Sequence, residues 1–304
     1  MTRTYLSFVV AFGLALHAGT AGADINVFTC EPEWAALATE LGGAHVVAES
    51  ATHGLQDPHY IQARPSLISR VRKADLVVCT GAQLEIGWLS MLLGKANNPA
   101  VLPGKPGFLE ASTLVPKLDI PQSVDRSQGD MHVGGNPHIQ GNPHNIALVA
   151  KGLADRLVTL DPVNADAYRS GLDSFLQRWQ AAIAGWENLA QPLRGKTLVA
   201  HHRSFTYLEE WLGLVELATL EPLPGIPPTS AHLAELLEML GTDGNGAAFI
   251  IREAYQSPKA SEWLSDKTGI PAVLLPTTVG GSTAATNLFT LFDDIINRLL
   301  EARP

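Results

Sequence analysis

The chain has 304 residues, of which 46% are hydrophobic, with 30 acidic and 21 basic residues and a formal net charge of −9. This length and apolar content are enough for two compact domains, each with its own core. The acidic balance argues against nucleic acid as a partner, because binding to a phosphate backbone depends on clustered Lys and Arg side chains.

The first residues are typical of a secretory signal. Arg3 precedes an apolar stretch from Tyr5 to Leu16, and Ala21-Gly22-Ala23 is a small-residue pattern that suits signal peptidase. The stretch is shorter than the roughly 20 apolar residues needed to span a bilayer. We therefore predict a signal peptide over residues 1–23 and a periplasmic mature protein with 20 basic and 30 acidic residues, a net charge of −10.

Short apolar runs alternate with amphipathic stretches along the mature chain, which indicates βα units and mainly parallel sheets. The predicted strands of the first half are Ile25 to Phe28, His45 to Val47 and Leu76 to Val78. Those of the second half are Thr197 to Ala200, Val215 to Leu220, Ala247 to Ile251 and Ala272 to Leu275. The predicted fold class is α/β, with two Rossmann-like lobes.

One long helix is predicted between the two halves, because Asn164 to Leu189 contains no Pro and carries apolar residues at near-helical spacing. It would extend roughly 35 to 40 Å at 1.5 Å per residue, about the width of a domain. The last helix, about Asn287 to Glu301, should cap a lobe core. We therefore divide the chain into an N-terminal lobe (24–162), a linker helix (163–190) and a C-terminal lobe (191–304).

The two cysteines, Cys30 and Cys79, each end a predicted strand and would meet an oxidising compartment after export. Two interpretations stay open. Neighbouring strand ends would allow a disulfide, and two separate small buried side chains would explain the same positions.

Three histidines and one glutamate follow predicted strands or lie in polar turns. His202 comes just after Thr197 to Ala200 and Glu253 just after Ala247 to Ile251, whereas His59 and His138 lie in segments rich in Gly, Asn, Asp and Pro. Ligands of open α/β sheets bind beyond the carboxyl ends of the strands. Three imidazoles with a carboxylate or water suit zinc, with manganese behind it, and oxygen-preferring calcium and magnesium fit poorly.

Each position also has a simpler explanation. His59 could cap a helix, His138 and His144 both follow Asn-Pro turns, and of His201 and His202 one must point away if the strand alternation continues. A zinc hydrolase with three His ligands and a catalytic water is the alternative function. No His-Glu-x-x-His motif supports it, and a surface adhesin would need an anchor or repeats, which are not evident.

Four segments resemble signature segments of the periplasmic zinc and manganese binding proteins of ABC importers, the ZnuA/TroA type, and most closely the AztC-like branch. They are Gln56-Asp57-Pro58-His59, Gly135-Asn136-Pro137-His138, Val199 to Leu208, and Leu220 to Pro228. The resemblance extends from Cys30-Glu31-Pro32-Glu33-Trp34 to Phe292-Asp293-Asp294. It implies two α/β lobes, a long linking helix and a metal held between the lobes by His59, His138 and His202, with His201 oriented elsewhere.

The resemblance also implies a protein that is not an enzyme, that carries Zn(II) as cargo to an ABC-type membrane permease and that acts as a monomer. A periplasmic zinc metallochaperone is a further candidate partner. Many members of the family have an aspartate ligand in the segment that here is Leu275 to Gly281, which contains no acid. Glu253 is therefore the predicted fourth ligand, with water, His132 and His144 as rivals; Asp57 and Glu85 are candidates to orient the ligand imidazoles.

Overall fold

The computed structural model describes residues 24–121, 129, 132–242 and 246–302. The predicted signal peptide lies outside these described residues. None of the helices in the described part is long and apolar enough to cross a membrane.

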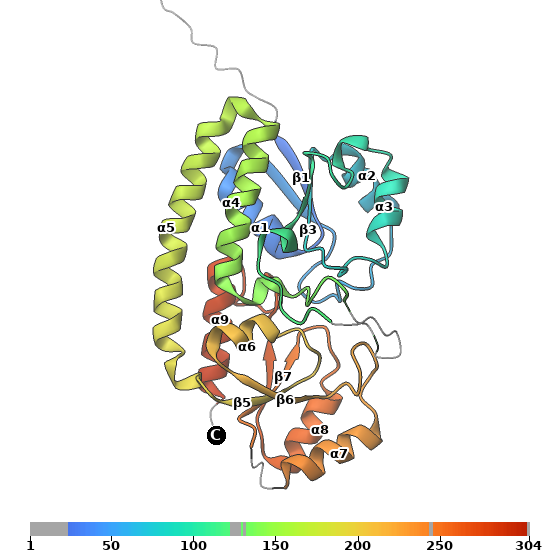
Figure 1. Ribbon diagram of the computed structural model, residues 1–304, viewed down its shortest axis with the longest axis vertical. Coiled ribbons are helices and arrows are strands. Elements are labelled where there is room, and N and C mark those ends of the chain that lie inside the picture. The colour runs from blue at the N-terminus through green and yellow to red at the C-terminus, as the bar shows by residue number, and fades with distance from the viewer. Residues whose placement is uncertain (1–23, 122–128, 130–131, 243–245, 303–304) are drawn as a thin grey trace, which may run out of the picture.

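The molecule consists of two lobes, each built on a four-stranded parallel sheet (Figure 1). The strand order is β2-β1-β3-β4 in the N-terminal lobe and β6-β5-β7-β8 in the C-terminal lobe, so the two sheets share one topology. The strands are β1 (Ile25–Thr29), β2 (Val46–Ser50), β3 (Leu76–Cys79), β4 (Phe108–Glu110), β5 (Thr197–Ala200), β6 (Val215–Thr219), β7 (Phe249–Glu253) and β8 (Ala272–Leu275).

Helices connect and cover the strands. They are α1 (Pro32–Gly42), α2 (Pro65–Lys73), α3 (Leu89–Ala96), α4 (Pro143–Leu160), α5 (Ala165–Leu189), α6 (Thr206–Leu212), α7 (Ser230–Leu240), α8 (Lys259–Thr268) and α9 (Leu288–Glu301). The predicted α/β class with two parallel-sheet lobes is therefore confirmed. All seven predicted strands are present, and the short strand β4 was missed because only three residues form it. The division of the chain at residues 162 and 190 stays a prediction.

The long helix α5 runs along both lobes, as the sequence predicts (Figure 1). Its buried face carries Tyr168, Phe175, Trp179, Ile183 and Trp186 at helical spacing. Trp179 and Trp186 pack against Phe292 of α9. The buried residues of α9 are Leu288, Leu291, Phe292, Ile295, Ile296 and Leu299, so this helix caps the core as predicted. A single core therefore continues from the N-terminal sheet across α5 and α9 into the C-terminal sheet, so burial of apolar area holds the lobes together.

A disulfide joins Cys30 and Cys79 at the carboxyl ends of the neighbouring strands β1 and β3. Their Cα atoms lie 4.8 Å apart, and both side chains are fully buried. Parallel pairing of β1 with β3 brings the two strand ends together although 49 residues separate them. Of the two interpretations left open by the sequence, the disulfide is confirmed.

The lobes also meet through close polar contacts. The Thr278 hydroxyl of the C-terminal lobe donates to the carboxylate of Glu33. A Cβ atom at Gly54 would lie 2.2 Å from the backbone of Gly280 and Gly281, so only glycine permits this approach of the two loops. These contacts fix the distance between the lobes beside the loops that carry the histidines.

Candidate metal site

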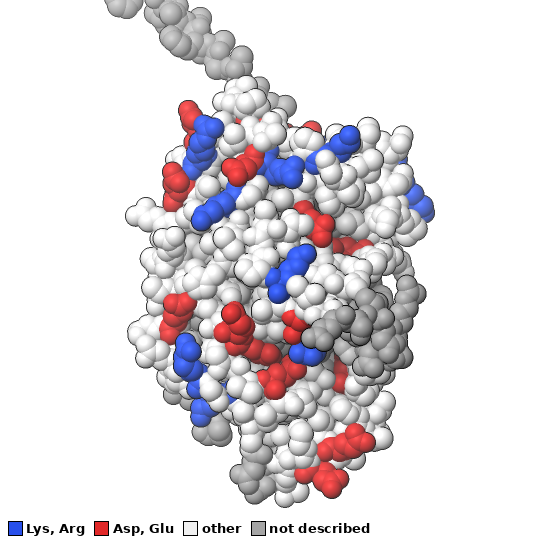
Figure 2. Space-filling view, viewed as in Figure 1, with Lys and Arg blue, Asp and Glu red and all other residues white. Residues whose placement is uncertain are grey.

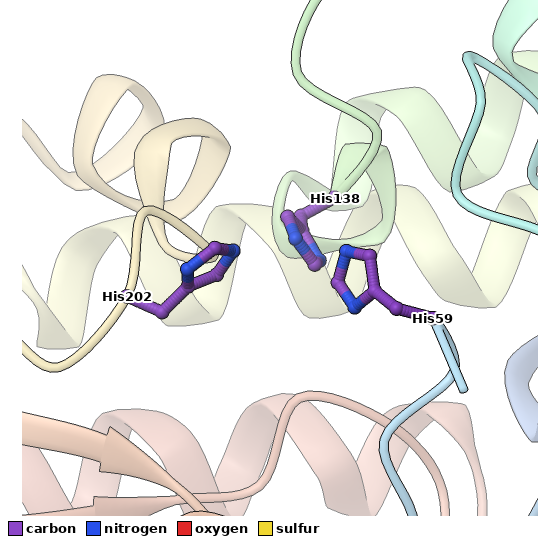
Figure 3. A group of neighbouring side chains, drawn as sticks. All are labelled: His59, His138 and His202. Atoms are coloured by element: carbon purple, nitrogen blue, oxygen red, sulfur yellow. The ribbon is translucent and has the colours of Figure 1, made fainter. Parts of the chain in front are cut away.

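His59, His138 and His202 come together between the lobes (Figure 3). His59 lies in the loop after β2, His138 directly precedes a 3₁₀ turn that leads into α4, and His202 follows β5 by two residues. The ring centroids lie 5.6 Å apart for His59 and His138, and 5.8 Å apart for each of the other two pairs. One nitrogen from each ring lies within 4.8 Å of the others, a spacing that lets three imidazoles share one metal ion.

Carboxylates orient two of the rings. Asp57 accepts from His59 Nδ1 at 2.7 Å and from the His59 backbone N–H at 2.9 Å. Glu221 lies 2.7 Å from His202 Nδ1 and accepts the Gly225 backbone N–H. We assign the proton to Nδ1 in both rings because each faces a carboxylate. Each Nε2 then presents a lone pair, the form in which imidazole binds a metal.

The same contacts shift the pKa values of these groups. Burial opposes the charged form of Asp57, but the hydrogen bond and the charge of His59 lower its pKa. Burial by itself would lower the pKa of the His202 imidazole, but the hydrogen bond to Glu221 and the charge of Glu221 raise this pKa above its ordinary value. The Asp57–His59 and Glu221–His202 pairs therefore both favour a positive charge at this buried position.

His138 is the most deeply buried of the three and has a different environment. Its side chain is 2% exposed, and its Nε2 has no hydrogen-bond partner among the described residues. Burial, followed by the positive charge of His59, His202 and His132, lowers the pKa of His138 well below its ordinary value. An unpartnered buried nitrogen that stays neutral fits a metal ligand, since an unpaired polar atom is otherwise costly.

Glu253 is the last residue of β7 and is buried, but it does not belong to the group of nitrogens that lie within 4.8 Å of one another. Its Oε2 atom accepts hydrogen bonds from Ser204, Tyr255 and Gln256. The structure therefore places Glu253 beside the histidines, where its charge acts on His202. Three donors already occupy one of its oxygens.

Of the other histidines considered in the sequence analysis, His132 lies beside the three grouped rings, whereas His144 and His201 do not belong to the group. The His132 ring stacks on that of His59, with centroids 5.5 Å apart, and lines a cavity together with His138 and His202. His144 bonds Glu187 on α5 at 2.9 Å, away from the group. His201 is buried next to His202 but is not a member of the group.

Two cavities flank the three rings. One, of about 110 Å³, is lined by Asp119, His132, His138 and His202 among others. The other, of about 220 Å³, is lined by Asp57, His59, Tyr60, His202, Glu221 and Tyr255 among others. On the face that Figure 2 shows, acidic side chains gather near the junction of the lobes and on the C-terminal lobe. The surroundings favour a cation.

Sequence reasoning anticipated Asp57 as an orienting group but missed Glu221. A signal was present, because Glu221 directly follows the apolar run that ends at Leu220, the position at which a parallel strand delivers its side chains to the site. Glu85, the other predicted orienting group, contacts no site histidine and instead accepts the backbone N–H groups of Thr80 and Gly81.

Two parallel-sheet lobes with an imidazole cluster between them define a metal-binding protein of the two-lobe binding type. The family model described as "Zinc-uptake complex component A periplasmic" (ZnuA) matches residues 27–302. The chain belongs to this family. It is therefore a metal-binding, substrate-binding protein of ABC importers and not an enzyme, which removes the hydrolase alternative.

Relatives and solved structures agree. The manganese ABC transporter substrate-binding lipoprotein PsaA of Streptococcus pneumoniae is 25% identical over 247 residues, 77% of this chain and 76% of PsaA. The high-affinity zinc uptake system protein ZnuA of Yersinia pestis is 28% identical over 199 residues, 60% of this chain and 61% of that protein. A crystal structure of ZnuA superimposes with a TM-score of 0.77 at 21% identity, covering 92% of this chain and all of the other.

Proposed function

We propose that the protein captures Zn(II) between its lobes with His59, His138 and His202 and delivers it to the membrane permease of an ABC importer. The observation that carries the proposal is the set of three imidazoles: two are oriented by carboxylates, and the third is buried with an Nε2 atom that has no hydrogen-bond partner among the described residues. Nitrogen donors favour zinc over manganese, which prefers carboxylate and water oxygens. Relatives named for manganese and for zinc are both similar to the chain. The proposal of zinc is therefore supported by the donor set and not by the relatives.

The fourth ligand has two candidates in the protein. Glu253 is the carboxylate predicted from the sequence, but its Oε2 atom already accepts three hydrogen bonds. His132 lies over His59 and lines the same cavity as His138 and His202. This position supports His132 as the stronger candidate, and its imidazole would keep the donor set suited to zinc.

Zinc titration against a chromophoric chelator tests the proposal. His59→Ala, His138→Ala and His202→Ala should each weaken binding by about a hundredfold or more, because a structural zinc site draws its affinity from few ligands. His144→Ala is the matched control, since His144 pairs with Glu187 outside the group. A one-to-one complex that survives all three substitutions would contradict the assignment.

Comparison of His132→Ala with Glu253→Gln tests the fourth ligand. We expect His132→Ala to weaken zinc binding and Glu253→Gln to change it less, because the glutamine can still accept from Ser204. The reverse order would assign the fourth position to Glu253. Equal and negligible effects would assign it to water.

We also propose that the chain acts as a monomer and that its loaded form is the one the permease recognises. Reconstituted permease should hydrolyse ATP faster with the zinc-loaded protein than with the His202→Ala variant. A periplasmic metallochaperone that loads the protein is a further candidate partner. A faster transfer of zinc from that partner than from free solution would support it.

A further inference from the structure

A third, much smaller cavity lies between the lobes, with His138 among its lining residues. Its volume is about 20 Å³, and its lining includes Glu31 and Glu33 of the Cys30-Glu31-Pro32-Glu33-Trp34 segment. Gln56, Gln140, Glu253 and Thr278 also line it. We call this space the carboxylate chamber. The chamber draws its walls from both lobes, and His138 of the histidine group forms part of its lining.

Three oxygens among the residues of the carboxylate chamber have no hydrogen-bond partner in the described part of the chain. They are Glu31 Oε1, Gln56 Oε1 and Gln140 Oε1. Glu31 is 3% exposed and Gln140 is 8% exposed. The Gln140 amide nitrogen donates to the Thr277 carbonyl at 3.4 Å, which leaves its oxygen as the free end. Buried hydrogen-bond acceptors without donors are rare in folded proteins, and they indicate a bound ion or water molecule.

A ligand of this chamber has to bind to oxygen atoms, because all three unpartnered atoms are oxygens. A water molecule can donate two hydrogen bonds, which is fewer than the three unpartnered acceptors of the chamber. Hard cations take such oxygen sets. A chamber of this size holds about one water-sized particle. Magnesium gives up its waters reluctantly and is too large for that space when hydrated, whereas calcium accepts protein oxygens in irregular geometry.

We propose that the carboxylate chamber is a second cation site, which takes a hard, oxygen-seeking cation of the calcium type through Glu31, Gln56 and Gln140. Gln56 lies in the loop after β2, and Gln140 lies in the 3₁₀ turn before α4. The Thr278 hydroxyl and Glu33 close the chamber across the lobe junction. A cation bound here would join the lobes independently of the metal at the histidines.

The protonation of the chamber agrees with this role. Burial, then the negative charge of Glu85 and Glu33, raises the pKa of Glu31 well above its ordinary value, and Glu31 shares a hydrogen bond with Glu85. Burial therefore favours the neutral form of Glu31 when no cation is present. Binding exchanges one proton for the cation: the carboxyl O–H bond breaks, the proton leaves to solvent, and the carboxylate oxygen binds the ion.

Equilibrium dialysis of the metal-free mature chain against radioactive calcium at pH 8 tests the proposal. We expect one calcium per chain, and at least tenfold weaker retention in Glu31→Gln. The glutamine can still accept from the backbone N–H and hydroxyl of Thr80, as Glu31 does. Its amide N–H groups would fill the chamber with donors. Glu238→Gln, an exposed site, is the control and should bind as the wild type does.

Further variants separate this site from the histidines. Gln140→Leu should also lose calcium, which covers the case in which Glu31→Gln does not fold. The double variant His59→Ala, His202→Ala, which leaves the lining of the chamber unchanged, should lose zinc and keep calcium. The proposal is overturned if the wild type retains no calcium, if Glu31→Gln and Gln140→Leu bind as tightly as the wild type, or if the double variant loses calcium together with zinc.

Discussion

The two lobes have the same sheet topology but use the ends of their central strands differently. In the C-terminal lobe, β7 ends at Glu253 and β5 ends two residues before His202, and both side chains lie at the site. In the N-terminal lobe, the equivalent strands β1 and β3 end in the Cys30–Cys79 disulfide and the hydrogen-bonded acids Glu31 and Glu85. The N-terminal lobe therefore contributes its histidines, His59 and His138, from segments outside its strands.

This difference has a physical consequence. A side chain at a strand end is positioned by the hydrogen bonds of the sheet, whereas a side chain on a loop needs other restraints. His59 receives them from Asp57, and His138 receives them from burial and from Asn136, whose side chain accepts the His138 backbone N–H at 3.0 Å. The disulfide and the hydrogen bonds of Glu31 and Glu85 to Thr80 fix the ends of β1 and β3 relative to each other.

Removal of the disulfide should have the largest effect on this comparison. Cys30→Ser with Cys79→Ser should lower the free energy of unfolding by about 2 to 5 kcal/mol, because the bond closes a loop of 49 residues in the unfolded chain. Urea unfolding monitored by tryptophan fluorescence measures it, and the wild type under reducing conditions is the control. An unchanged midpoint would mean that the strand ends hold together without the bond.

Gly54→Ala tests the close contact between the lobes. The added Cβ would meet the backbone of Gly280 and Gly281 at 2.2 Å and should cost about 1 to 3 kcal/mol of stability. Gly185→Ala in α5 is the matched control, because apart from the adjoining backbone of its own helix no described atom lies within 4 Å of its Cβ position. It should instead stabilise the helix by about 0.5 to 1 kcal/mol. Equal effects of the two changes would contradict a tight lobe contact at Gly54.

Asp57→Asn and Glu221→Gln test whether loop and strand histidines depend equally on their carboxylates. Each should weaken zinc binding by about 10- to 100-fold, because the carboxylate fixes the ring and increases its basicity. Glu187→Gln, which removes the partner of His144, should leave zinc affinity unchanged. A larger loss in Asp57→Asn than in Glu221→Gln would show that the loop histidine depends more on its partner.

Glu33→Gln tests the cost of the buried acids. Burial raises the pKa of Glu33 to about 7, so the folded state holds more protons than the unfolded state between about pH 4.5 and 7. The free energy of unfolding should therefore fall as the pH rises through this window. In calcium-free buffer Glu33→Gln should reduce this fall by on the order of 1 kcal/mol at pH 8 and match the wild type near pH 4. Parallel pH profiles of the two proteins would refute the expectation.

Much of the fold could be predicted because its signals are local. Apolar runs at strand length and the helical spacing of Tyr168, Phe175, Trp179 and Ile183 follow from the periodicities of strands and helices. The strand β4 could not be predicted, since three residues carry no periodic pattern. Element ends also shifted by a few residues, as in β2, which begins at Val46 and continues to Ser50.

The site was predictable in its histidines and less so in their surroundings. His59, His138 and His202 stand at strand ends or polar turns, which are local features, whereas the approach of Glu221 to His202 depends on how β5 and β6 pair. The same applies to His132 and Glu253, whose places relative to the rings depend on the packing of separate loops. A carboxylate next to a strand end could contact many different side chains in the folded protein. The number of residues between them in the sequence does not show which contact forms.

By itself, the sequence determined the α/β class and the long connecting helix, because hydrophobic periodicity acts within short segments. It also predicted His59, His138 and His202 as ligands, from strand ends, polar turns and the family resemblance. Only the tertiary structure decided that Cys30 bonds Cys79, that Glu221 orients His202 and that unpartnered oxygens of Glu31, Gln56 and Gln140 line one chamber. Each of these depends on groups brought within a few ångströms by parallel strand pairing and by the contact of two lobes. Those distances are set by packing of the whole core.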